Sequence, residues 1–254
     1  METETFNRKA AIWAGMALVT VSIGANIPYS ALISLFDYDD VLRRPAGEAL
    51  ALFHSRGAPL VLAWWTFALS ALGLAGVAAL VGEALKGGKA QLSSGFTMFG
   101  VISGVLQGAA LLRWTFVIPH LAESYVNAAP GSAERASLLA TYDMLNGFAG
   151  AGMGEHLGQI LLMVWTFGVG LALARMGGAM RWIGAFGLVT LPVWIVGQTE
   201  LLALSIPGLP VIEVIPYAFM AWEVWMLVLG VALLAKALRQ DAVDGSRQPL
   251  ASPA

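Results

Sequence analysis

The chain has 254 residues, of which 58% are hydrophobic and only 12% are charged, and its formal net charge is −2. Soluble domains carry about 25% charged residues, so a soluble core could not bury this much apolar surface and lipid must cover part of it. The near-neutral charge gives no indication of a nucleic-acid partner, and the absence of Cys excludes disulfides, thiolate metal sites and cysteine nucleophiles. The composition therefore predicts an integral membrane protein in contact with the lipid bilayer.

Six stretches of about 20 predominantly apolar residues follow one another along the chain, and each is long enough to cross a bilayer as a helix. The predicted spans are Ala10–Phe36, Pro59–Leu85, Phe96–His120, Met153–Ala174, Trp182–Ile206 and Val214–Leu238. The first is longer than the apolar region of a secretory signal, about 7–15 residues, so we interpret it as a membrane span. The sequence thus predicts an all-α, polytopic transmembrane helix bundle.

Two shorter segments between the spans are predicted to be amphipathic helices at the membrane interface. The first is Val41–Ser55, where Pro45 either breaks the helix or starts its second half. The second is Ala136–Phe148. Four glycines crowd around the start of the fourth span, and they indicate a bend or a close approach of two backbones: Gly147, Gly150, Gly152 and Gly154.

Lys and Arg are distributed unevenly between the two sides of the membrane. Six spans place both termini on one side, and that side carries nine of these residues: Arg8, Lys9, Lys86, Lys89, Arg175, Arg181, Lys236, Arg239 and Arg247. The opposite loops carry four: Arg43, Arg44, Arg56 and Arg135. The positive-inside rule therefore predicts cytoplasmic termini in a bacterial inner membrane. Residues 1–238 are expected to form one bundle domain, and residues 239–254 a polar, disordered tail.

Most polar residues within the spans fall in the half that lies away from the termini. Arg113 lies seven residues before His120, which places it roughly 10 Å deeper and on the same helix face. Glu223 and Asn26 each lie about 15 Å from the outer ends of their spans. Burying a lone ion in hydrocarbon costs a few kcal/mol, so Arg113 needs a partner, and its depth favours Glu223 over Glu200.

These residues support three hypotheses, which the sequence leaves open. In the first, an outward-facing pocket binds or translocates a small polar or anionic ligand, or protons; its residues would be Arg113, Glu223, Glu200, Asn26, Gln159 and Gln198. In the second, the buried ions only hold the bundle together in a structural or regulatory protein, which could form a homo-oligomer. Neither requires an enzymatic activity or a cofactor.

In the third hypothesis, the protein is a membrane-embedded enzyme or a metal-binding protein that uses the histidines at the outer ends of the helices. Imidazole and carboxylate ligands suit a divalent metal, and the candidates are His120, His156, Glu155 and His54. However, the sequence contains no H-E-x-x-H spacing, and adjacent Glu155 and His156 point to different helix faces.

Three sequence features occur together in one known group of bacterial proteins. They are an arginine in the third span (Arg113), a "P-R-W-L-…-G" entry to the fifth (Met180-Arg181-Trp182-Ile183 with Gly184 and Gly187), and an acidic residue in the last (Pro216 to Glu223, with Trp222 and Trp225). The chain resembles the proteins grouped as domain of unknown function 4386. It departs from them at Ala179-Met180, where the family often has proline. The resemblance implies a fold of about six spans and no specific activity.

Overall fold

A computed structural model describes residues 7–38, 40–87 and 91–246. Every regular element within these residues is helical. In chain order the elements are α1 (Arg8–Phe36), the 3₁₀-helix η1 (Asp40–Arg43), α2 (Ala46–Arg56), α3 (Ala58–Ala84), α4 (Ser94–Leu111), α5 (Arg113–Phe116), α6 (Ile118–Asn127), α7 (Ala133–Leu145), the π-helix η3 (Asn146–Leu157), α8 (Gly158–Met176), α9 (Gly178–Ala203) and α10 (Ile215–Ser246).

Six helical stretches are long and apolar enough to cross a membrane, which confirms the predicted all-α bundle. They are Arg8–Phe36, Ala58–Ala84, Ser94–Asn127, Ala133–Met176, Gly178–Ala203 and Ile215–Arg239. Large apolar side chains remain exposed on their outer faces; Ile27, for example, is 72% exposed and Val189 is 70% exposed. The protein is therefore a multi-pass membrane protein whose outer surface contacts lipid.

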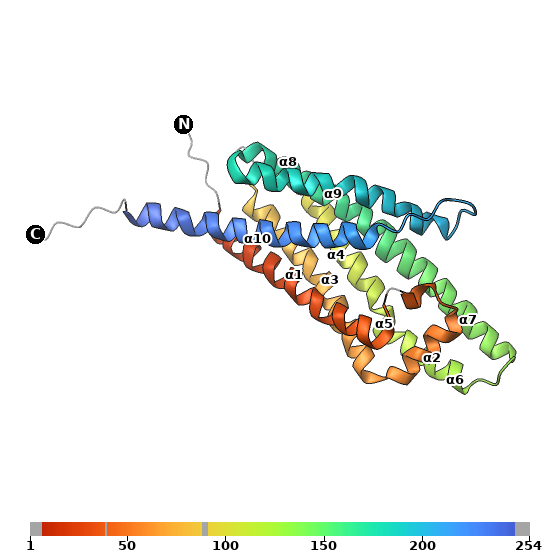
Figure 1. Cartoon of the computed structure of the whole chain (residues 1–254). Helices are drawn as coiled ribbons and strands as arrows, with labels where there is room; N and C mark the ends of the chain where they lie inside the picture. The colour runs from red at the N-terminus through yellow and green to blue at the C-terminus, as the bar shows by residue number, and fades with distance from the viewer. Residues whose placement is uncertain (1–6, 39, 88–90, 247–254) are drawn as a thin grey trace, which may run out of the picture.

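The six spans form a ring in which each packs on the next in the chain. Contacts join α1 to α3, α3 to α4, α4 to α8, α8 to α9 and α9 to α10, and α10 returns to α1. α1 begins and α10 ends at the same end of the molecule (Figure 1). The two helices cross closely there. A Cβ at Gly15 would lie only 2.7 Å from the carbonyl oxygen of Gly230. Towards the other end, α1 and α10 diverge (Figure 1).

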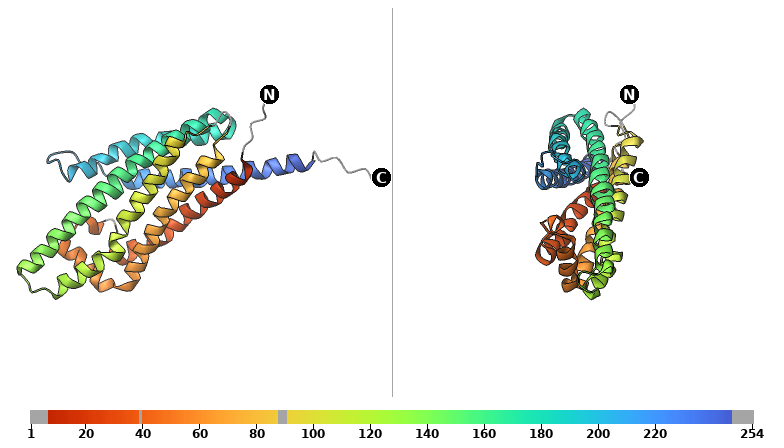
Figure 2. Two further views of the ribbon diagram at one scale, coloured as in Figure 1. Left: turned by 180° about the vertical axis from the view of Figure 1, so that it is seen from behind. Right: turned by 90° about the vertical axis from the view of Figure 1, so that its right-hand side faces the viewer.

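The fourth span belongs to one continuous rod rather than following a separate interfacial helix. Ser132 caps the start of α7 by accepting a hydrogen bond from the backbone N–H of Arg135 at 3.1 Å. From there the helix runs through η3 into α8 without interruption, and the rod extends along the length of the molecule (Figure 2). The predicted break at Phe148 is absent because the glycines widen the helix into a π-helix instead of ending it.

Two other helices end beyond their predicted limits. The third span continues to Asn127, but Pro119 has no N–H for the carbonyl of residue 115, and the helix is interrupted at Val117. α10 continues past Leu238 to Ser246, since residues 239–244 contain no Gly or Pro that would stop it. The first part of the predicted disordered tail is therefore helical; residues 247–254 of that tail lie outside the described residues.

Candidate functional site

The π-helix η3 packs one face against the third span through glycines. A Cβ at Gly150 would lie 2.4 Å from Nη2 of Arg113, and a Cβ at Gly154 would lie 2.7 Å from the Cβ of Ala110. No residue larger than glycine fits at either position without a shift of its neighbour. π-helical turns occur frequently at functional sites, so both faces of η3 are of interest.

Arg113 is buried against this glycine face, with 7% of its surface exposed. Its Nη1 donates to the carbonyl oxygen of Ala110 at 2.8 Å, and its Nη2 donates to Oδ1 of Asn146 at 2.9 Å. The guanidinium carbon lies 5.2 Å from the ring centroid of Trp114. Glu155, in the same π-helix as Asn146, attracts the guanidinium electrostatically. These contacts tie the interruption between α4 and α5 to the start of η3.

The expected pair between Arg113 and Glu223 is not formed within the described part of the chain, and Arg113 does not pair with Glu200 either. Both oxygens of Glu223 accept from Nδ2 of Asn26, at 3.4 and 3.5 Å. Glu200 accepts from Nη2 of Arg43 at 2.5 Å. The reason is the order of helices in the ring: α10 packs on α1 and α9, whereas Arg113 faces the rod.

Two predicted pocket residues do meet, in a buried hydrogen-bonded chain between the rod and α9. Nε2 of Gln198 donates to Oε1 of Gln159 at 2.7 Å, and both glutamines are buried. Oε1 of Gln198 lies 2.8 Å from Nδ1 of His156. Because an amide oxygen can only accept, Nδ1 of the imidazole carries a proton in this hydrogen bond.

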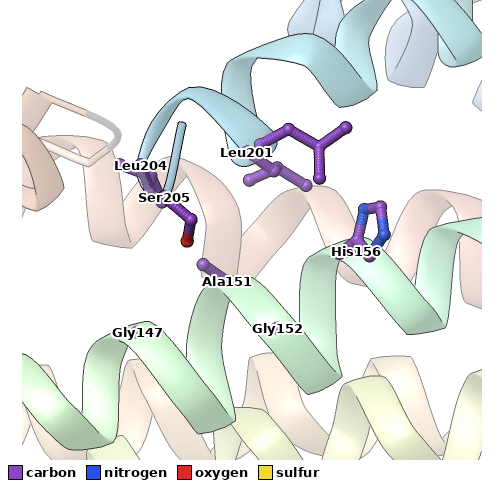
Figure 3. Close-up of a pocket in the computed structure, with 8 residues that line it drawn as sticks. Gly147, Ala151, Gly152, His156, Leu201, Leu204 and Ser205 are labelled. Atoms are coloured by element: carbon purple, nitrogen blue, oxygen red, sulfur yellow. The ribbon is translucent and has the colours of Figure 1, made fainter. Parts of the chain in front are cut away.

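The hydrogen bonds that join Gln159, Gln198 and His156 end at a pocket of about 280 Å³, which we call the ligand pocket. η3 contributes Gly147, Ala151, Gly152 and His156, and the end of α9 with the following residues contributes Leu201, Leu202, Leu204 and Ser205. Ala151 and Ser205 point towards each other across it, and the His156 ring projects from η3 towards α9 (Figure 3). The lining is mainly apolar, with His156 and Ser205 as its polar side chains.

Comparison with known proteins identifies the family. Residues 13–237 match the model of a domain of unknown function, DUF4386. The chain belongs to this family. The match includes nearly all of the six spans, which confirms the resemblance drawn from the sequence, and the family's description names no activity. No curated protein and no solved structure matches the chain.

The histidines of this DUF4386 protein lie in three different elements. His54 lies in α2, His120 in α6 and His156 in η3. No group of three or more His, Asp or Glu side chains suited to a metal ion occurs in the residues that the structure describes. Glu155 belongs to the surroundings of Arg113 rather than to a set of metal ligands. The metal hypothesis therefore gains no support from the geometry.

The sequence reasoning missed Asn146, Gly150 and Ala151 as site residues. The glycine-rich segment was visible, but Gly150 and Gly154 make room for side-chain atoms of Arg113 and Ala110 and not for a second backbone. The missing information was the widened helical period of η3. It decides which of these residues face Arg113 and which face the ligand pocket.

Proposed function

We propose that this DUF4386 protein binds a small molecule in the ligand pocket between η3 and α9. The supporting observation is the coincidence of a pocket of about 280 Å³ with an imidazole fixed by a buried hydrogen-bonded chain. That volume is at the small end of ligand sites, which run from about 300 to 1,000 Å³ and combine an apolar lining with a few polar groups.

The hydrogen-bonded chain supports a small polar ligand that carries a hydrogen-bond donor. Gln198 holds a proton of His156 on Nδ1, so Nε2 is the acceptor whenever the ring is neutral. A hydroxyl or amine would meet this acceptor, while the leucines from α9 would contact an apolar body. Gln159 and Gln198 act by orienting the ring, and they need not touch the ligand.

The pocket is proposed to open on the periplasmic side of a bacterial inner membrane. It is formed at the end of α9, which lies away from the end where α1 begins and α10 ends (Figure 1). The excess of Lys and Arg on the terminal side supports cytoplasmic termini.

Arg113 has a different role in this proposal. Its hydrogen bonds run to groups of the bundle itself, so it holds η3 in place and does not contact the ligand.

The experiment fills the pocket and compares ligand-dependent stability. Ala151→Phe places a ring where the Cβ already points across the pocket, and Ala140→Phe, at an exposed position earlier in the same rod, is the matched control. Purified protein in detergent is screened by thermal unfolding against a panel of small alcohols and amines. A ligand at about 100 times its Kd stabilises the folded protein by about 2.7 kcal/mol.

We expect at least one compound to raise the Tm of the wild type and of Ala140→Phe, but not of Ala151→Phe. A shift that survives in Ala151→Phe, or no shift with any compound, would refute the proposal.

A further inference from the structure

A second polar location, distinct from the ligand pocket, lies between α1 and α10. The helices cross at Gly15 and Gly230, and Glu223 lies seven residues before Gly230, which is about 10 Å along the helix. From this crossing the two helices separate towards the end away from the termini (Figure 1). Glu223 therefore lies within a membrane span, on the side of the crossing away from the termini.

Within the part of the chain that the structure describes, the carboxylate of Glu223 has only a weak, neutral hydrogen-bond donor. Nδ2 of Asn26 approaches its two oxygens at 3.5 and 3.4 Å, while the same nitrogen donates to the carbonyl of Ser22 at 2.7 Å. Among the described residues no Lys, Arg or His forms an ion pair with Glu223; the ion pairs found involve other carboxylates. The negative charge of an ionised Glu223 is thus left uncompensated by any cation of the described residues.

The helices packed against α10 supply no such charge either. After its first turn, α1 carries Tyr29 as its single ionisable side chain. α9 carries Arg181 in its first turn, at the other end of the helix, and Glu200, which is paired with Arg43. On insertion scales, a charged side chain at the centre of a membrane helix raises the free energy of insertion by about 3 kcal/mol. One long hydrogen bond from an amide does not offset this cost. The neutral, protonated form of Glu223 avoids that cost.

A polar stripe on α1 connects this carboxyl to the end of the bundle away from the termini. Asn26, Ser30 and Ser34 follow one another at four-residue intervals, so they share one face of α1, and all three are exposed. The hydroxyl of Ser30 donates to the backbone carbonyl of Asn26 at 2.8 Å, and the hydroxyl of Ser34 donates to the backbone carbonyl of Ser30 at 3.0 Å. Their hydroxyl oxygens remain able to accept hydrogen bonds from water.

We propose that Glu223 is a proton-binding site of the membrane domain, protonated at neutral pH and exchanging its proton along the α1 polar stripe. Glu223 does not line the ligand pocket, so this inference does not rest on the proposed small-molecule binding. A carboxyl in this position would let the protein respond to the proton concentration on the side of the membrane away from its termini.

The test uses dicyclohexylcarbodiimide, an apolar reagent that adds to protonated carboxyl groups and leaves a stable acylurea. The full-length protein in membranes is treated at about pH 8, well above the ordinary carboxyl pKa of about 4.3, and the labelled residues are located by mass spectrometry. We expect label on Glu223 and none on Glu123, an exposed carboxylate of α6. Labelling of Glu223 should fall about tenfold per pH unit once its proton is lost.

Because the wild type is the labelled species, the result does not depend on a variant that might misfold. Glu223→Gln should abolish the label. Absence of label on Glu223, or label that is independent of pH and equal to that on Glu123, would overturn the proposal. The ligand pocket can fail its own test without affecting this outcome.

Discussion

Replacing Gly150 by alanine tests the contact between η3 and Arg113 directly. The new Cβ would lie 2.4 Å from Nη2 of Arg113 and 2.9 Å from its Cζ, closer than real Cβ contacts allow. Arg113 as a whole is only 7% exposed, so its guanidinium has little free space to move into. Its displacement would break the bond to Asn146 at 2.9 Å and strain the bond to the Ala110 carbonyl at 2.8 Å.

The magnitude follows from these two hydrogen bonds and from helix propensity. A hydrogen bond to a charged group contributes about 1.5–3 kcal/mol, and a buried donor left without a partner costs about as much as its lost bond. Alanine in place of glycine returns about 1 kcal/mol to a helix. We therefore expect Gly150→Ala to destabilise the protein by about 2–4 kcal/mol.

Gly147→Ala is the matched control, since a Cβ at Gly147 meets nothing within 4 Å. It should be neutral or should stabilise the protein by about 1 kcal/mol. A double-mutant cycle tests whether the contact with Arg113 causes this loss of stability. In an Arg113→Met background, Gly150→Ala should lower the free energy of unfolding by less than about 1 kcal/mol, because the clashing group is gone. The free energies of unfolding of the control and of the four proteins in the cycle are measured in mixed micelles with a rising SDS fraction, followed by tryptophan fluorescence. Equal effects of Gly150→Ala and Gly147→Ala, or an unchanged cost in the Arg113→Met background, would refute the reasoning.

Two further predictions concern the core and the orientation. Thr166→Val leaves the buried Nε1 of Trp222 without the acceptor it has at 2.9 Å, and should lower the unfolding free energy by about 1–3 kcal/mol. Thr190→Val, which loses only a bond within its own helix, should cost less; comparable midpoints for the two variants would contradict this. A fluorescent protein fused to the C-terminus should be active in the cytoplasm and an alkaline phosphatase fusion inactive. The opposite pattern would reverse the orientation and place the ligand pocket on the cytoplasmic side.

The polar residues separate what was predictable from what was not. Gln159 and Gln198 were predicted as residues of one pocket, and they meet in the structure because they project from neighbouring helices in the ring. Arg113 was correctly placed inside the bundle, but its partner was chosen by depth alone. Depth says how far along a helix a residue lies and nothing about which helix faces it, so Asn146 was missed in favour of Glu223.

The sequence by itself determined the six spans and the all-helical class. These are local properties, since lipid cannot satisfy backbone polar groups and a run of about 20 apolar residues must bond within itself as a helix. Only the tertiary structure decided how those helices turn towards one another. The glycine segment widened into η3, and this set Gly150 against Arg113 and Ala151 into the ligand pocket. Such contacts depend on the rotation and order of packed helices, which hydropathy does not encode.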